Sequence, residues 1–105
     1  MIPPVEPASH YSVVYSERVR ISLRRLIGQA KALGRGQDIM AAVKEIDERL
    51  HVFPQFGQPL YDLKSQKETV WIGVVAPLVA RYIIDENRRM VFVVIPLRPL
   101  RRSGF

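Results

Sequence analysis

Residues 78–95 read LVARYIIDENRRMVFVVI, two apolar runs separated by a short polar segment. β-branched and aromatic residues dominate both runs, 78–85 and 90–95, and this composition predicts two β-strands. The polar segment 85–88 between them is typical of a hairpin loop. Because VFVVI is apolar without interruption, we expect the sheet to be covered on at least one face. This stretch therefore predicts an antiparallel hairpin at the centre of the fold.

One more strand and two helices are predicted before this hairpin. Residues 70–75 form the strand, and Pro77 separates it from the next one because proline cannot donate to a sheet ladder. The first helix begins after Ser16, a favoured N-cap residue, and ends at Gly34, which readily adopts the left-handed conformation. Asp38 is expected to cap the second helix. Both helices carry apolar residues at helical spacing, which predicts one buried stripe on each.

The predicted fold class is α+β. A short strand over 10–15 precedes the first helix, so the element order is β-α-α-β-β-β, a helical hairpin packed on a small antiparallel sheet. A length of 105 residues suits one domain. We expect this domain over 10–98, between a proline-rich N-terminal lead-in over 1–9 and a basic C-terminal tail over 99–105. The core is expected to include Trp71 and Phe92.

Several kinds of catalytic site are excluded by composition. The sequence has no cysteine, so it has no disulfide and no thiolate metal site. Its two histidines, His10 and His51, have no near partner at metal-ligand spacing, and we expect neither a metal nor a cofactor. The carboxylates of the second helix are expected on its solvated face; they are Glu45, Asp47 and Glu48.

No membrane segment is predicted. The longest apolar run, 70–80, is far shorter than the roughly 20 residues that span a bilayer. The N-terminal residues MIPPVEPASH contain three prolines and no apolar stretch of the kind found in signal peptides. We therefore expect a cytoplasmic protein that does not bind a membrane.

The net charge of +6 is unevenly distributed along the chain. Residues 16–35 contain six basic and one acidic residue, and residues 88–105 contain five basic and no acidic residue. Two segments of this kind favour an anionic partner such as nucleic acid or an acidic protein. A basic surface that only keeps the protein in solution is the alternative.

The first helix carries candidate binding residues on both sides of its apolar stripe. At 100° per residue, Arg20, Arg24 and Lys31 fall on one flank, and Arg18 and Arg25 fall together on the opposite flank. Long basic side chains in such positions can contact phosphates or an acidic helix while their stems cover the edge of the core.

The C-terminal tail, PLRPLRRSGF, is a second candidate region. Arg98, Arg101 and Arg102 follow the last strand, and two prolines keep the chain extended. Arginines at the end of a sheet can contact phosphate through two hydrogen bonds at once.

Arg81 interrupts an otherwise apolar strand. Alternation along the strand places it on the same face as Val79 and Ile83. A charge at this position requires either an open face or a partner. Two interpretations follow: a structural ion pair with Asp85 or Glu86, or a functional role for the guanidinium.

Short motifs in the order of the chain support a family resemblance. They are VYSE at 14–17, LHVFPQFG at 50–57, Pro59-Leu60, RYIIDEN at 81–87, VFVVI at 91–95 and Arg98. Together with the element order, they resemble the RelE/ParE toxin superfamily of bacterial toxin–antitoxin systems, over about residues 10–98.

This resemblance implies a small basic toxin that a cognate antitoxin holds inactive. The expected assembly is either a homodimer or a toxin–antitoxin hetero-oligomer. RelE-like members cut mRNA on the ribosome, whereas ParE-like members act on DNA gyrase. The mRNA chemistry needs cations beside the scissile phosphate and a group that moves the proton of the 2′-hydroxyl.

The sequence differs from the RelE-like nucleases at several positions. Residues 70–75 contain no lysine or arginine, and Leu97 stands where a histidine often precedes Arg98. Arg81 and Arg98 are therefore the remaining catalytic candidates. The leading interpretation is a toxin-like protein that binds a macromolecular target, with Arg20, Arg24, Lys31, Arg101 and Arg102 as candidate contact residues. The alternatives are an mRNA interferase and a non-toxic interaction module.

Overall fold

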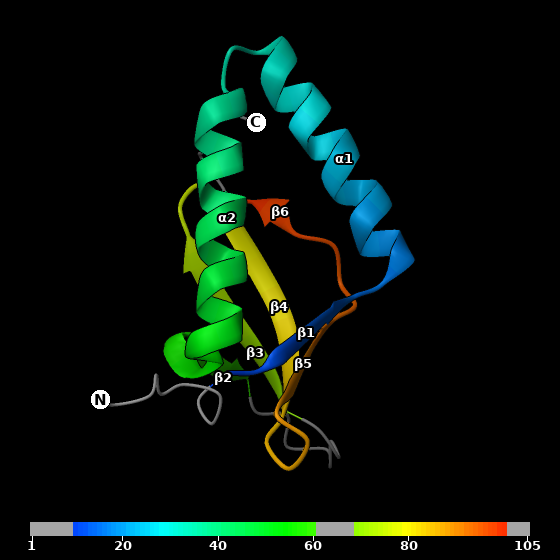
Figure 1. The fold of residues 1–105 in the computed structure, drawn as a ribbon. Helices are drawn as coiled ribbons and strands as arrows, with labels where there is room; N and C mark the ends of the chain where they lie inside the picture. Colours follow the sequence, from blue (N-terminus) through cyan, green and yellow to red (C-terminus); the bar gives the residue numbers. More distant parts are fainter. Residues whose placement is uncertain (1–9, 61–68, 101–105) are drawn as a thin grey trace, which may run out of the picture.

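A computed structural model describes residues 10–60 and 69–100 (Figure 1). The predicted α+β fold, with two helices on a sheet, is confirmed. The elements are β1 (Ser12–Tyr15), α1 (Glu17–Ala32), α2 (Gly36–Val52), the 3₁₀ turn η2 (Pro54–Phe56), β2 (Gln58–Leu60), β3 (Val70–Val75), β4 (Leu78–Asp85), β5 (Met90–Val93) and β6 (Arg98–Pro99). Two of these strands, β2 and β6, were not predicted. The lead-in over 1–9 lies outside the described residues.

The sheet has the strand order β1-β5-β4-β3-β2, and β6 pairs with β4. Strands β2 to β5 are antiparallel to their neighbours, as is β6 to β4. The expectation of a wholly antiparallel sheet is wrong for β1, which runs parallel to β5. A tight hairpin forces consecutive strands to be antiparallel. Both helices separate β1 from the other strands, so no hairpin fixes its direction.

The first helix begins and ends as predicted. The hydroxyl of Ser16 accepts a hydrogen bond from the backbone N–H of Val19 at 3.2 Å. Gly34 has φ of 75°, and this left-handed residue ends the helix. The predicted cap of α2 is wrong, because the helix begins at Gly36 without a side-chain cap. Asp38 lies in the first turn instead, where its charge is favourable beside the N-terminal end of the helix dipole.

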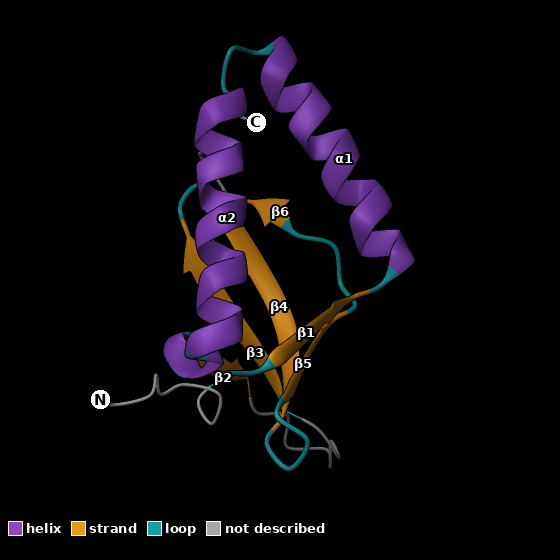
Figure 2. Ribbon diagram, in the orientation of Figure 1, coloured by secondary structure: helices purple, strands orange, loops and turns teal. Residues whose placement is uncertain are grey.

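Helix α2 covers one face of the sheet, as Figures 1 and 2 show. Its buried stripe packs in one core cluster with alternate residues of β4. The members on α2 are Ile39, Ala42, Ile46 and Leu50, and those on β4 are Leu78, Ala80 and Tyr82. Helix α1 contributes Val19, Leu26 and Ala30, and its main partner among the other elements is α2. The intervening side chains of β4 therefore lie on the face that α2 does not cover.

The two aromatic side chains expected in the core lie on different faces. Trp71 packs against the core cluster, as predicted. Phe92 is paired with Ile83 and lies on the other face, so its placement in the core is wrong. Neither α1 nor α2, the two helices of the described chain, has the length and apolar content needed to cross a bilayer.

A matched pair of glycine substitutions tests this packing. A Cβ atom on Gly73 would lie 2.4 Å from the Phe56 ring, whereas one on Gly28, inside α1, would meet nothing within 4 Å. We expect Gly73→Ala to lower the free energy of unfolding by about 1–3 kcal/mol through overpacking. Gly28→Ala should raise it by about 0.5–1 kcal/mol, because alanine favours a helix interior. Urea denaturation measures both, and a neutral Gly73→Ala would contradict the close packing of η2 on β3.

Candidate functional site

The candidate site is the face of the sheet that α2 leaves uncovered, which we call the open face. It consists of the side chains that alternate with the core residues along neighbouring strands. Its central members are Val70, Ile72 and Val74 of β3, Val79, Arg81 and Ile83 of β4, Phe92 of β5 and Arg98 of β6. Helix α2 lies over the other face of the sheet (Figure 2), and α1 packs on α2 and contributes to the same core cluster. The open face is therefore an apolar surface with two arginines.

The open face brings together Arg81 and Arg98, the two catalytic candidates of the sequence. Arg98 is the cross-strand partner of Val79, and Arg81 lies two residues further along β4. This diagonal arrangement on one face separates neighbouring residues by about 7–8 Å. A hollow of ≈ 620 Å³ beside Arg98 is lined by Val79, Arg98, Pro99 and Leu100. Of the two arginines, Arg98 lines this hollow, so an anion bound there would lie against its side chain.

Neither predicted ion pair of Arg81 is present, so the structural interpretation of this residue is wrong. Asp85 pairs with Arg88, whose Nε lies 3.0 Å from the carboxylate Oδ2. Glu86 instead accepts hydrogen bonds from the Tyr11 hydroxyl at 2.8 Å and from the Gln55 amide at 2.7 Å. The Nε atom of Arg81 is buried and has no hydrogen-bond partner. A desolvated, unsatisfied donor of this kind favours an added acceptor such as a carboxylate or phosphate oxygen.

The other basic candidates are not part of this site. Arg20, Arg24 and Lys31 are exposed on α1, which packs on α2 on the opposite side of the sheet. Their place on one flank follows from helical spacing, and their role in binding stays a prediction. The remaining two, Arg101 and Arg102, lie outside the described residues.

A cluster of Tyr15, Asp47 and His51 was not predicted. The Tyr15 hydroxyl donates a hydrogen bond to Asp47 Oδ1 at 2.5 Å, and His51 Nδ1 lies 3.6 Å from the same carboxylate. Burial, followed by the interaction with Asp47, raises the pKa of Tyr15 well above its usual range. Tyr15 therefore stays protonated at neutral pH and cannot act there as a general base. No local pattern in the sequence indicates this contact, because Tyr15 and Asp47 belong to different elements.

Tyr82 is also a structural residue. Its hydroxyl donates to the backbone carbonyl of Pro54 at 2.6 Å, and burial raises its pKa to about 12. A second unpredicted network joins the Tyr11 hydroxyl to Gln55 Nε2 at 2.9 Å, and the Arg89 guanidinium lies 4.6 Å from the Tyr11 ring centre. These contacts connect η2, the start of β1 and the β4–β5 turn. Across the described residues, no cluster of three or more His, Asp or Glu side chains could hold a metal ion.

Comparison with known proteins identifies the fold. No family model and no curated protein matches the sequence. Among solved structures, a chain of the RelBE2 toxin–antitoxin complex from Mycobacterium tuberculosis matches with a TM-score of 0.61. The match covers 90% of this chain and 97% of that chain, at 18% sequence identity. The chain has the RelE-like toxin fold. The family resemblance seen in the motifs is thus confirmed for the fold.

Substitution of Arg81 by leucine tests whether its guanidinium has a structural partner. Leucine removes an unsatisfied buried donor and breaks no ion pair. We expect the free energy of unfolding of Arg81→Leu, measured by urea denaturation, to stay within about 0.5 kcal/mol of the wild type or to exceed it.

The neighbouring variant Tyr82→Phe is the control, since it removes the hydrogen bond to Pro54 and should lower stability by about 1 kcal/mol. A loss of about 3 kcal/mol or more in Arg81→Leu would contradict the account, because losses of that size follow the breaking of a buried ion pair.

Proposed function

We propose that this chain is the toxin component of a type II toxin–antitoxin system that acts in the cytoplasm by binding a macromolecular target. A cognate antitoxin would neutralise it in a hetero-oligomeric complex. The RelE-like fold supports this proposal, because the matching solved chain belongs to a toxin–antitoxin complex. The domain over 10–98 would carry the activity.

The observation that carries the proposal is the pair Arg81 and Arg98 on the open face. On this face, Arg81 is paired with Ile72 and Arg98 is paired with Val79, so their cross-strand neighbours are apolar. Neither guanidinium has an acidic partner within the described residues. Arginines in apolar surroundings are common energetic centres of protein–protein interfaces. An acidic patch on the target would neutralise both charges and cover the apolar surface at the same time.

An mRNA interferase is the second candidate, because the same two cations would stabilise the charge that develops on a scissile phosphate. Such a reaction also requires a group that takes the proton of the 2′-hydroxyl. The described neighbours of Arg81 on the open face, Val79, Ile72 and Ile83, are apolar and offer no such group. Binding is therefore the better-supported activity, with DNA gyrase or the ribosome as the target. The flank Arg20, Arg24 and Lys31 would extend the contact surface.

Growth after induction tests the proposal. We expect induction of the chain alone to arrest growth and co-expression of the adjacent gene to restore it. Arg81→Ala should weaken the arrest, because it removes half of the cationic pair. Arg88→Ala is the control, because the charge of Arg88 is already neutralised by Asp85. Unchanged growth with the wild type would contradict a toxin and favour a non-toxic interaction module.

The purified protein then identifies the target. Inhibition of gyrase supercoiling without mRNA cleavage is the result expected for a binding toxin of the ParE-like kind. Primer extension on translated mRNA that shows codon-positioned cuts, lost in Arg81→Ala, would favour the interferase instead.

A further inference from the structure

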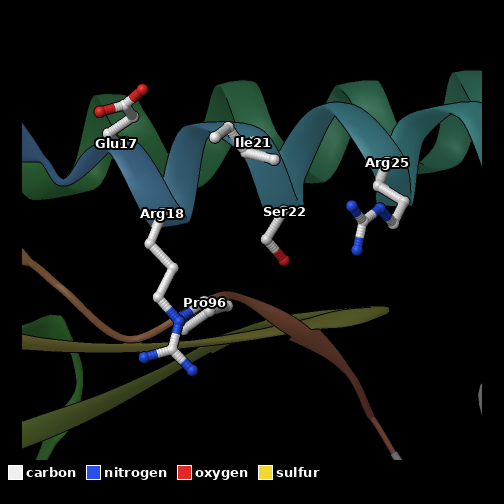
Figure 3. Close-up of a pocket in the computed structure, with 6 residues that line it drawn as sticks. All are labelled: Glu17, Arg18, Ile21, Ser22, Arg25 and Pro96. Carbon is white, nitrogen blue, oxygen red and sulfur yellow. The ribbon is translucent and has the colours of Figure 1, made fainter.

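A second candidate interface lies on α1, away from the open face. A shallow groove of ≈ 520 Å³ runs between this helix and the β5–β6 connection. Its lining residues are Glu17, Arg18, Ile21, Ser22, Arg25 and Pro96. Figure 3 shows Arg18, Ser22 and Arg25 projecting from the same side of α1, with Arg18 reaching toward Pro96. The groove is thus formed by one flank of a helix and a single loop.

Two positive charges line this groove at a regular spacing. Arg18 and Arg25 are seven residues apart, which corresponds to two helical turns and about 10 Å along the axis. Both are exposed, and neither forms a hydrogen bond or ion pair within the part of the chain that the structure describes. This flank is separate from the one that carries Arg20, Arg24 and Lys31.

The carboxylates of the neighbouring helix do not neutralise these charges. In α2, Glu45 pairs with Arg49, and Asp47 interacts with Tyr15 and His51. Helix α1 itself contains five basic residues and one acidic residue, Glu17. Its positive charge is therefore available to an external partner.

The groove also offers apolar contact. Ile21 is 45% exposed between the two arginines, and Pro96 forms the opposite wall. Gly28, three residues after Arg25 on the same helix, is exposed and leaves open space where a side chain would stand. A partner backbone can approach α1 closely at this position.

The lining favours a protein segment over a nucleic acid. None of the six lining residues is aromatic, so bases have no surface on which to stack. Ile21 and Pro96 add apolar surface, which the side chains of a protein segment can cover and a sugar–phosphate backbone does not use. An acidic, amphipathic segment matches the two arginines and the apolar surface between them: its carboxylates would pair with Arg18 and Arg25, and its apolar side chains would contact Ile21 and Pro96.

We propose that this groove binds an acidic, amphipathic segment of the antitoxin. Carboxylates of the segment pair with Arg18 and Arg25, and an apolar side chain between them packs on Ile21. This inference rests on the proposed function, since it names the surface and the chemistry of the neutralising contact. The antitoxin contact proposed here lies on α1, whereas the pair Arg81 and Arg98 of the open face lies on β4 and β6.

A pair of charge-reversal variants tests the site. Arg18→Glu combined with Arg25→Glu changes the groove, whereas Arg20→Glu combined with Arg24→Glu makes the same change in charge on the opposite flank of α1. The probe is the full-length product of the adjacent gene, titrated at low ionic strength into each full-length variant by isothermal calorimetry. Circular dichroism confirms that each variant is folded.

We expect the groove variant to bind the probe at least about tenfold more weakly than the control variant, because it places like charges opposite the partner's carboxylates. Its loss of affinity should shrink at high salt, which screens exposed charges. Ile21→Ser should also weaken binding without changing any charge. In cells, the groove variant should arrest growth even when the adjacent gene is co-expressed.

Equal loss of affinity in both double variants would overturn the inference, because net charge rather than the groove would then control binding. The inference would also be overturned if the groove variant lost binding to a single-stranded RNA oligonucleotide but still bound the adjacent gene product normally. That result would assign the groove to nucleic acid. Failure of the wild type both to bind the adjacent gene product and to arrest growth would instead contradict the proposed function itself.

Discussion

The packing of α2 on a single face of the sheet is the constraint on which the rest of the structure depends. The stripe from Ile39 to Leu50 is buried against the core face of β4, which includes Ala80 and Tyr82. Side chains alternate along a strand, so this packing also determines that Arg81 lies on the opposite face. One apolar contact thus fixes both the core and the position of the unpaired arginine.

The same constraint divides the surface into two regions with different chemistry. The open face is apolar around Arg81 and Arg98, and it suits a partner that buries a broad, flat area. The groove beside α1 carries Arg18 and Arg25 on either side of the exposed Ile21, and it suits a narrow segment with spaced carboxylates. A protein with two such surfaces can contact a target and a neutralising partner through different elements, although occupancy of one can still hinder access to the other.

The sequence predicted what depends on local chemistry and missed what depends on contacts between distant residues. Ser16 and Gly34 act through their own backbone, so both ends of α1 were predictable. The face of Phe92 was not, because VFVVI has no polar alternation that distinguishes its two sides. Whether Arg81 forms an ion pair was also not predictable, because it depends on which other residues bind Asp85 and Glu86. Asp85 forms an ion pair with Arg88, and Glu86 accepts hydrogen bonds from Tyr11 and Gln55, which are distant in the sequence.

The most direct test of the account is the exposure of the two sheet faces in the free, full-length protein. Carbene labelling with residue-level mass spectrometry measures it. We expect strong labelling of Ile72, Val74 and Ile83, and little labelling of Ala80 and Tyr82 on the strand that carries Arg81. Equal protection of both sets would show that the face around Arg81 is covered in the free protein, and it would contradict the assignment of this face as the binding surface.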